Sequence, residues 1–221
     1  MNTRVLIICG GDGKRWNNHT GVPKHLLKID GVPLLDRVIG QCRGVDDIVI
    51  ICSTDDERYH RPGIELFVPP IDTSRVADVG SNSQPRWNLQ GKTICLLGDV
   101  WFEDEGIDRV LKDDYQTFVM YGRSGASHVT GKPWAEDFAC SFYPLDHADY
   151  LSLLSKHVND TVTPWNHVAK GFQRIDNKPH KVCLYGLTED FDYPHDLRIW
   201  LEMRDLHRNE LNQTNVKTVG V

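Results

Sequence analysis

Several features that mark large classes of proteins are missing from this 221-residue sequence. Its longest apolar runs have about five or six residues, whereas a membrane-spanning helix needs roughly 20. The sequence has no charged start followed by an apolar core and a small-residue cleavage site, so we expect no signal peptide. Lys and Arg number 25 against 31 Asp and Glu, and the formal net charge of -6 argues against broad binding to nucleic acid. We therefore expect partners other than membranes and nucleic acids.

The six cysteines also lack a pattern, because no two of them stand in a CxxC pair with zinc-site or redox spacing. Most lie within apolar runs, as Cys52 does in DIVIIC and Cys95 does in TICLL. This placement is typical of small buried side chains in a reducing compartment. We expect free cysteines and a cytoplasmic protein.

Short apolar runs rich in β-branched residues alternate with helical patterns along the first half of the chain. The runs expected to form strands are 4–9, 47–52, 64–68, 93–99 and 117–121. Apolar residues on consecutive positions suit strands that are covered on both faces, as in a parallel sheet. Helices are expected at 33–42 and 102–113, where apolar residues repeat along one helical face. The alternation predicts an open α/β sheet.

The second half of the sequence is less regular. Its apolar patterns predict strands at 136–144 and 181–186, a helix at 146–158 and a helix that begins at Pro194. Because no repeat, linker or low-complexity segment separates the halves, we expect a single domain over residues 1–221.

The first apolar run ends in a glycine-rich loop, CGGDGKRW, which begins at Cys9. Glycines let backbone N–H groups approach an anion with no Cβ in the way, and Arg15 and Lys24 add positive charge. Two common phosphate loops do not match. The loop lacks GxxxxGK[ST], and Trp16 stands where the dinucleotide fingerprint needs its third glycine. The loop is predicted to bind phosphate in another way, with a structural glycine turn as the alternative.

The residues after the loop follow a specific order. Gly11-x-Gly13-x-Arg15 is followed by Pro23-Lys24-x-Leu26-Leu27 and then by IDGVPLL. Over residues 4–42 this pattern resembles the sugar-nucleotide and MobA-like nucleotidyltransferases. The resemblance implies a Rossmann-like, three-layer α/β/α fold with a mixed, mostly parallel sheet of the nucleotide-diphospho-sugar transferase type.

The same resemblance implies which residues bind a nucleoside triphosphate. In that family the glycine loop wraps the triphosphate, while an arginine and a lysine hold its phosphates. The positions that match the loop are Gly10, Gly11, Gly13 and Lys14. Those that match the two catalytic cations are Arg15 and Lys24.

Two acidic segments are candidates for a metal site. Asp99 ends the apolar run TICLLGD, and Asp190 and Asp192 lie in DFDYPHDL, just before a predicted helix. The second segment resembles the D-x-D-T-P-E-D-L motif of cytidylyl- and guanylyltransferases in this superfamily. That resemblance implies Mg²⁺ bound by Asp99 and Asp192, with Asp190 as a third ligand. A simple turn at Asp99 and a helix cap at Asp192 are the alternatives, and Asp196 is expected to support the helix.

The combined resemblance implies an Mg²⁺-dependent nucleotidyltransferase that moves a nucleotide from a triphosphate to a small anionic acceptor, such as a sugar phosphate. Residues 1–120 would bind the nucleotide, residues 121–211 the acceptor, and residues 212–221 would form a frayed tail. The segment 122–143 is a candidate lid or acceptor pocket, and a solvated loop is its alternative. Two other functions stay open, a metal-dependent glycosyltransferase and an inactive nucleotide-binding domain. A homodimer is also compatible with the sequence.

Overall fold

The computed structural model describes residues 2–10, 15–16, 19–70, 81–157 and 164–218. A seven-stranded sheet lies at its centre, with the strand order β10-β8-β9-β6-β1-β4-β5. Its strands are β1 (Thr3–Cys9), β4 (Asp47–Cys52), β5 (Glu65–Phe67), β6 (Lys92–Leu97), β8 (Val119–Arg123), β9 (Glu136–Phe142) and β10 (Lys181–Cys183). Only β9 is antiparallel to its neighbours, β6 and β8. The predicted mixed, mostly parallel sheet is confirmed.

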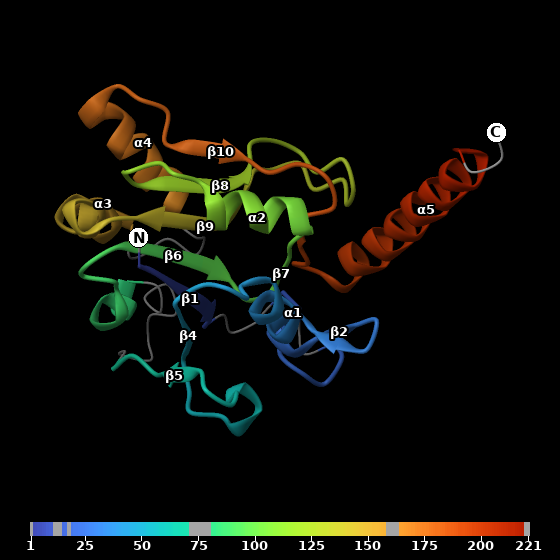
Figure 1. The fold of residues 1–221 in the computed structure, drawn as a ribbon, viewed down its shortest axis with the longest axis horizontal. Helices are drawn as coiled ribbons and strands as arrows, with labels where there is room; N and C mark the ends of the chain where they lie inside the picture. Colours follow the sequence, from blue (N-terminus) through green and yellow to red (C-terminus); the bar gives the residue numbers. More distant parts are fainter. Residues whose placement is uncertain (1, 11–14, 17–18, 71–80, 158–163, 219–221) are drawn as a thin grey trace.

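Helices cover both faces of this sheet (Figure 1). On one face, α1 (Leu34–Gln41) and α2 (Asp104–Lys112) pack on strand residues such as Ile7. On the other, α3 (His147–Leu154) and α4 (Trp165–Asp176) pack on the alternate residues, such as Leu6. Successive strand side chains point to opposite faces, so consecutive apolar residues serve both cores. The three layers agree with the predicted fold.

One helix, α4, was not predicted from the sequence. α4 contains Gly171 in its middle, and glycine weakens a helical pattern. The structure explains this glycine, because a Cβ at position 171 would lie 2.4 Å from a methyl group of Leu153 on α3. Gly171 therefore allows the two helices to pack closely.

A third apolar cluster lies beside the sheet, where the carboxyl-terminal helix α5 (Pro194–Thr218) begins. Trp16 is only 1% exposed and belongs to this cluster together with Trp200 of α5. Its large side chain therefore fills the space beside α5. Arg204 and Arg208 both pair with Asp30, in the turn between β2 (Lys28–Ile29) and β3 (Val32–Pro33).

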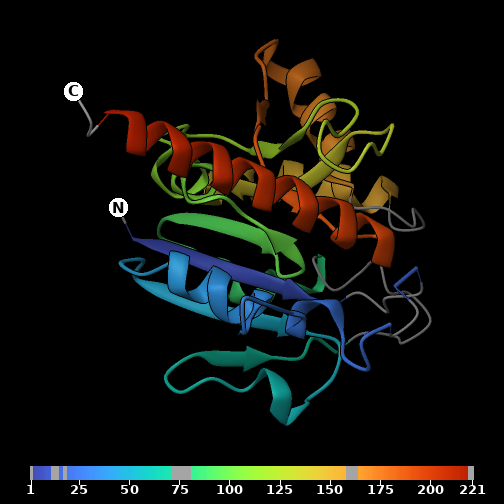
Figure 2. The same ribbon diagram turned by 90° about the vertical axis from the view of Figure 1, so that its right-hand side faces the viewer.

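Figures 1 and 2 show α5 as a long helix that crosses one side of the molecule and extends beyond it. The helix continues to Thr218, so residues 212–218 of the segment expected as a frayed tail lie within α5. The physical reason is that no helix breaker follows Pro194 before Gly220.

Two further sequence-based expectations concern the cysteines and membrane-spanning helices. The six cysteines are free, and all but Cys183 are buried, as predicted from their apolar surroundings. Among the helices in the described ranges, none combines the length and apolar character of a membrane span.

Candidate active site

The site lies at the edge of the sheet where the parallel strands have their carboxyl ends. There, β1 leads into Gly10, β4 into Ser53, and β6 through Gly98 into Asp99. Because β9 runs in the opposite direction, its first residue, Glu136, pairs with Arg123 at the end of β8. Ligands of open α/β sheets bind at this edge. Five loops or strand ends therefore contribute residues to one place.

A two-stranded ribbon brings a remote segment to the same edge. β7 (Val100–Trp101) directly follows Asp99 and pairs antiparallel with β11 (Glu189–Asp190). The register sets Asp190 opposite Val100, next to Asp99. The two acidic segments that were predicted to converge are thus brought together by backbone pairing.

Lys24 lies between these segments. Its Nζ is 2.8 Å from Oδ2 of Asp99 and 2.9 Å from Oδ1 of Asp190. Burial opposes the charge of the lysine, but the carboxylates of Asp190 and Asp99 outweigh burial and raise the pKa of Lys24 well above its usual value. Burial also opposes the charge of Asp99, yet Lys24 lowers the pKa of Asp99 to about 2. Both groups are therefore ionised at neutral pH.

Arg15 contacts the acidic segment from the glycine loop. Its Nη1 donates a hydrogen bond of 2.7 Å to Oδ2 of Asp192. The Arg15 side chain is 52% exposed, whereas that of Asp192 is 2% exposed. An exposed guanidinium has further N–H groups with which to meet phosphate oxygens. Gly10 is buried at the end of β1, while Gly11, Gly13 and Lys14 lie outside the described residues.

Three carboxylates form a candidate cation site. One oxygen from each of Glu136, Asp190 and Asp192 lies within 4.8 Å of the other two. Oδ1 of Asp192 is buried and has no hydrogen-bond partner within the part of the chain that the structure describes, which is uncommon for a buried carboxylate oxygen. Mg²⁺ prefers such oxygen ligands. The donor set and the unpartnered oxygen therefore fit a divalent cation such as Mg²⁺.

Lys132, on the segment between β8 and β9, supports this acidic cluster from within the protein. Its side chain is 3% exposed, and its Nζ lies 3.4 Å from Oε1 of Glu136 and 3.6 Å from Oδ2 of Asp192. The same Nζ lies 3.6 Å from Oε1 of Glu189 and donates to the carbonyl of Asp190. Burial opposes its charge, but these carboxylates outweigh burial and raise the pKa of Lys132. The lysine is a buried counterion for the cluster.

Carboxylates at this edge resist ionisation to different extents. Burial and the nearby Asp190 raise the pKa of Glu136 to about 7. Burial and Asp190 also raise the pKa of Asp192, against the opposing effect of Lys132. The physical cause is the same in both cases, since negative charges close together in a buried place repel one another. A bound cation would relieve this repulsion.

The loop 124–135 is tied to the site by Glu189, which is fully buried. Arg123 Nη1 donates to both carboxylate oxygens of Glu189 at 2.9 Å. Hydroxyl groups of Ser127 and Thr130 donate to Oε2 of the same residue at 2.5 Å and 3.2 Å. These contacts anchor the loop at the site. The alternative of a simply solvated loop therefore does not hold.

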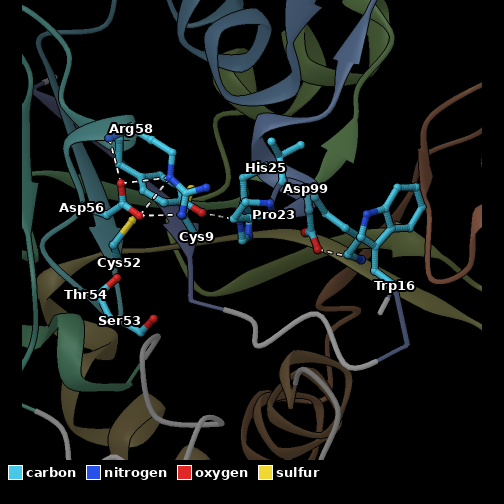
Figure 3. Close-up of a pocket in the computed structure, with 13 residues that line it drawn as sticks. Cys9, Trp16, Pro23, His25, Cys52, Ser53, Thr54, Asp56, Arg58 and Asp99 are labelled. Atoms are coloured by element: carbon cyan, nitrogen blue, oxygen red, sulfur yellow. Dashed lines mark hydrogen bonds and ion pairs between the residues drawn. The ribbon is translucent and has the colours of Figure 1, made fainter. Parts of the chain in front are cut away.

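A cavity of about 280 Å³ opens beside Lys24 (Figure 3). It lies between the end of β4, marked by Cys52, Ser53 and Thr54, and the side of the site that carries Asp99. Its wall includes His25, whose Nδ1 is 3.1 Å from the hydroxyl of Tyr59. Burial lowers the pKa of His25, so this part of the wall is uncharged at neutral pH. The cavity thus has a neutral wall at His25 and Tyr59, a charged end at Lys24 and Asp99, and the paired Asp56 and Arg58 in its remaining lining.

Sequence reasoning identified most of this constellation. The structure brings together the predicted Arg15, Lys24, Asp99, Asp190 and Asp192, although their roles stay predictions. Glu136 was expected only as part of an acceptor segment. The signal that could have found it is topological, because an antiparallel strand begins where its parallel neighbours end.

Comparisons with known proteins agree with this geometry. Residues 5–78, roughly a third of the chain, match the family profile described as the MobA-like NTP transferase domain. No match was found among curated protein sequences.

Solved structures share the fold along nearly the whole chain. The CTP:phosphocholine cytidylyltransferase of Streptococcus pneumoniae has a TM-score of 0.65 and 16% identity, over 92% of this chain and 99% of that one. The inositol-1-phosphate CTP transferase of T. maritima has a TM-score of 0.62 and 18% identity, over 92% and 95%. The UDP-glucose pyrophosphorylase of Acinetobacter baumanii has a TM-score of 0.58 and 11% identity, over 99% and 100%. The profile match and the shared fold together confirm the resemblance to sugar-nucleotide and MobA-like nucleotidyltransferases that residues 4–42 carry.

Proposed function

We propose that this protein is an Mg²⁺-dependent nucleotidyltransferase that transfers a nucleoside monophosphate from a triphosphate to a small phosphorylated acceptor. The observation that carries the proposal is the position of Lys24, whose ammonium group lies within 2.9 Å of carboxylates from two remote segments, Asp99 and Asp190. A nucleotide cavity, an exposed arginine and an acidic cluster surround this lysine. Phosphoryl chemistry needs this combination of anchored cations and carboxylates.

The nucleoside would occupy the cavity beside Lys24, with its phosphates directed toward Lys24 and Arg15. The neutral wall with His25 and Tyr59 suits an uncharged base and ribose. The charged end suits the triphosphate, whose oxygens pair with ammonium and guanidinium groups. Gly10, Gly11, Gly13 and Lys14 belong to the loop that we propose to wrap the triphosphate.

Asp190 and Asp192 would hold the metal, whereas Asp99, the other ligand expected from the sequence, lies outside the cluster of three carboxylates among the described residues and would pair with Lys24. When bound, Mg²⁺ would neutralise phosphate charge and polarise a phosphate oxygen. Two cations of the chain itself would stabilise the other charges that form during the reaction. Lys24 would stabilise the charge that builds at the α-phosphate, and Arg15 the charge of the departing pyrophosphate.

The reaction requires little covalent chemistry from the protein. An oxygen of the acceptor's phosphate attacks the α-phosphorus, and a new P–O bond forms. The bond between the α-phosphorus and the oxygen that bridges to the β-phosphate breaks, and pyrophosphate leaves with that electron pair. The attacking oxygen is already anionic at neutral pH, so no general base is required. Positioning and charge neutralisation supply the rate.

We infer a phosphate monoester as the acceptor class. Two structural relatives are named for phosphocholine and inositol-1-phosphate, which are both small phosphate monoesters. The anchored loop 124–135 carries the half-exposed Trp134, which offers a flat apolar surface beside the acidic cluster. A small organic group linked to phosphate would fit between that ring and the triphosphate.

The test is pyrophosphate release. The protein would be mixed with each of the four common nucleoside triphosphates, Mg²⁺ and pools of sugar phosphates and other phosphorylated alcohols. We expect pyrophosphate with one triphosphate and only when an acceptor is present. In a parallel reaction with nucleotide sugars, their hydrolysis without any pyrophosphate release in the first assay would support a glycosyltransferase instead, and tight nucleotide binding with neither product would support an inactive binding domain.

A further inference from the structure

We infer that Glu136 is a ligand of the divalent cation, together with Asp190 and Asp192. This inference rests on the proposed function, because it assigns a further residue to the metal of that reaction. Its first support is geometric: one carboxylate oxygen of each of the three residues lies within 4.8 Å of the other two. Such a spacing lets a single small cation contact all three.

The second support is the unpartnered oxygen of Asp192. This residue is 2% exposed, and its Oδ1 has no hydrogen-bond partner among the described residues, although its Oδ2 accepts from Arg15. Leaving a buried carboxylate oxygen unsatisfied costs about 1–3 kcal/mol or more. A cation held in common with Glu136 and Asp190 would satisfy that oxygen.

The third support is the way in which Glu136 is held. Trp134 Nε1 donates to Oε1 of Glu136 at 2.7 Å, and Lys132 Nζ lies 3.4 Å from the same oxygen. Carboxylates that bind metals are commonly oriented by such hydrogen bonds from neighbouring residues. Glu136, the first residue of the antiparallel strand β9, is thus held close to Asp190 and Asp192.

The charge balance also favours a cation. The carboxylates in contact with one another or with the same cations are Asp99, Glu136, Glu189, Asp190, Asp192 and Asp196. The cations that pair with them are Arg15, Lys24, Arg123 and Lys132. The six carboxylates outnumber the four cations by two, and one divalent cation would balance that difference.

With Glu136 as a ligand, the metal would lie on the side of Lys24 where we propose that the acceptor binds. Glu136 follows the loop 124–135 directly, so a cation bound to Glu136 also fixes the end of the loop that carries Trp134. Mg²⁺ bound by a few carboxylates keeps its remaining positions for phosphate oxygens and water. Metal binding and acceptor binding are therefore expected to strengthen each other.

The test measures binding of Mn²⁺ alone, without nucleotide, from the electron paramagnetic resonance signal of the free ion. We expect Glu136→Gln to weaken Mn²⁺ binding at least about tenfold. The matched control is Asp137→Asn on the same strand, which removes an equal charge; the Asp137 carboxylate accepts from the backbone of Asn166 on the α4 side. That control is expected to keep the wild-type affinity, and circular dichroism checks that both variants are folded.

A second measurement locates the cation independently of affinity. Tb³⁺ replaces divalent ions at carboxylate sites and emits when a nearby tryptophan is excited. At Tb³⁺ concentrations that saturate both proteins, we expect tryptophan-sensitised emission from the wild type and the loss of most of it in Trp134→Phe. Unchanged Mn²⁺ affinity in Glu136→Gln, equal losses in both carboxylate variants, or no Mn²⁺ binding by the wild type at millimolar concentration would overturn the assignment.

The outcome is separable from that of the proposed function. If pyrophosphate is released but Glu136→Gln binds Mn²⁺ like the wild type, the ligand assignment fails and the transferase stands. If Mn²⁺ binding depends on Glu136 but no triphosphate yields pyrophosphate, the site is supported and the transferase is rejected.

Discussion

Lys24 and Lys132 are both buried at the same edge of the sheet, and they differ in what surrounds them. Lys24 is 11% exposed and contacts two carboxylates beside a cavity. Lys132 is 3% exposed, and its Nζ lies 3.4 to 3.7 Å from four carboxylates. A lysine with an open side can exchange one carboxylate for a phosphate. An enclosed lysine cannot, and its charge serves to hold acidic side chains together.

The comparison teaches that burial of a cation does not by itself indicate its role. Both lysines have a raised pKa because carboxylates outweigh the cost of burial. What separates them is access to space that a ligand can enter. Substitutions at the two positions should therefore affect different quantities, stability for Lys132 and rate for Lys24.

The largest effect is expected from Lys132→Met. This change removes the counterion of four carboxylates while keeping the volume of the side chain. Breaking a buried ion pair by removal of one partner costs about 3–5 kcal/mol, because the other charge remains buried. Urea unfolding at neutral pH would measure the loss. If Lys132→Met lowers the free energy of unfolding no more than Lys24→Met does, the proposed difference between the two lysines is contradicted.

Lys24→Met is expected to act on the reaction. Removal of one group that stabilises developing charge typically lowers kcat about 10²–10³-fold. The rate of pyrophosphate release would be compared with that of Lys28→Met, a change at an exposed lysine on β2 in the same segment. The role of Lys24 in the reaction would be contradicted if Lys24→Met and Lys28→Met both kept the wild-type rate. It would also be contradicted if Lys24→Met lost activity only because it unfolded.

How much of this site could be predicted depends on the kind of signal each residue leaves in the sequence. Lys24 and Arg15 stand at fixed distances from glycines and from Pro23, so local order was sufficient. Asp99 follows an apolar run, and Asp192 precedes a proline-initiated helix. Such neighbours are visible without a structure.

Glu136 and Lys132 had no comparable local signal. Their place in the site depends on the antiparallel direction of β9 and on the buried Glu189, which ties the loop 124–135 to β11. The contacts of Glu189 with Arg123 and Ser127 join residues more than 50 positions apart. The helix α4 was missed for a similar reason, because only its packing against Leu153 explains the glycine at its centre.

The smallest effect concerns Asp137, the neighbour of Glu136 on β9. Burial raises the pKa of Asp137 to about 6 from a usual value of 3.8. A raised folded-state pKa means that its contribution to stability is present below pH 4 and is lost as the pH rises through about 6. Asp137→Asn should therefore gain about 1–2 kcal/mol over the wild type at pH 8, and little at pH 4. Urea unfolding from pH 4 to 8 would measure this, and parallel profiles would contradict it.

The central claim is that the α-phosphorus is the atom transferred. It is tested most directly by following ³²P from the triphosphate that supports pyrophosphate release, in two parallel reactions with the label at the α or the γ position. The account predicts that the α label appears in the acceptor product and the γ label in pyrophosphate. Transfer of the γ label to the acceptor, or its release as inorganic phosphate with no α label transferred, would contradict it.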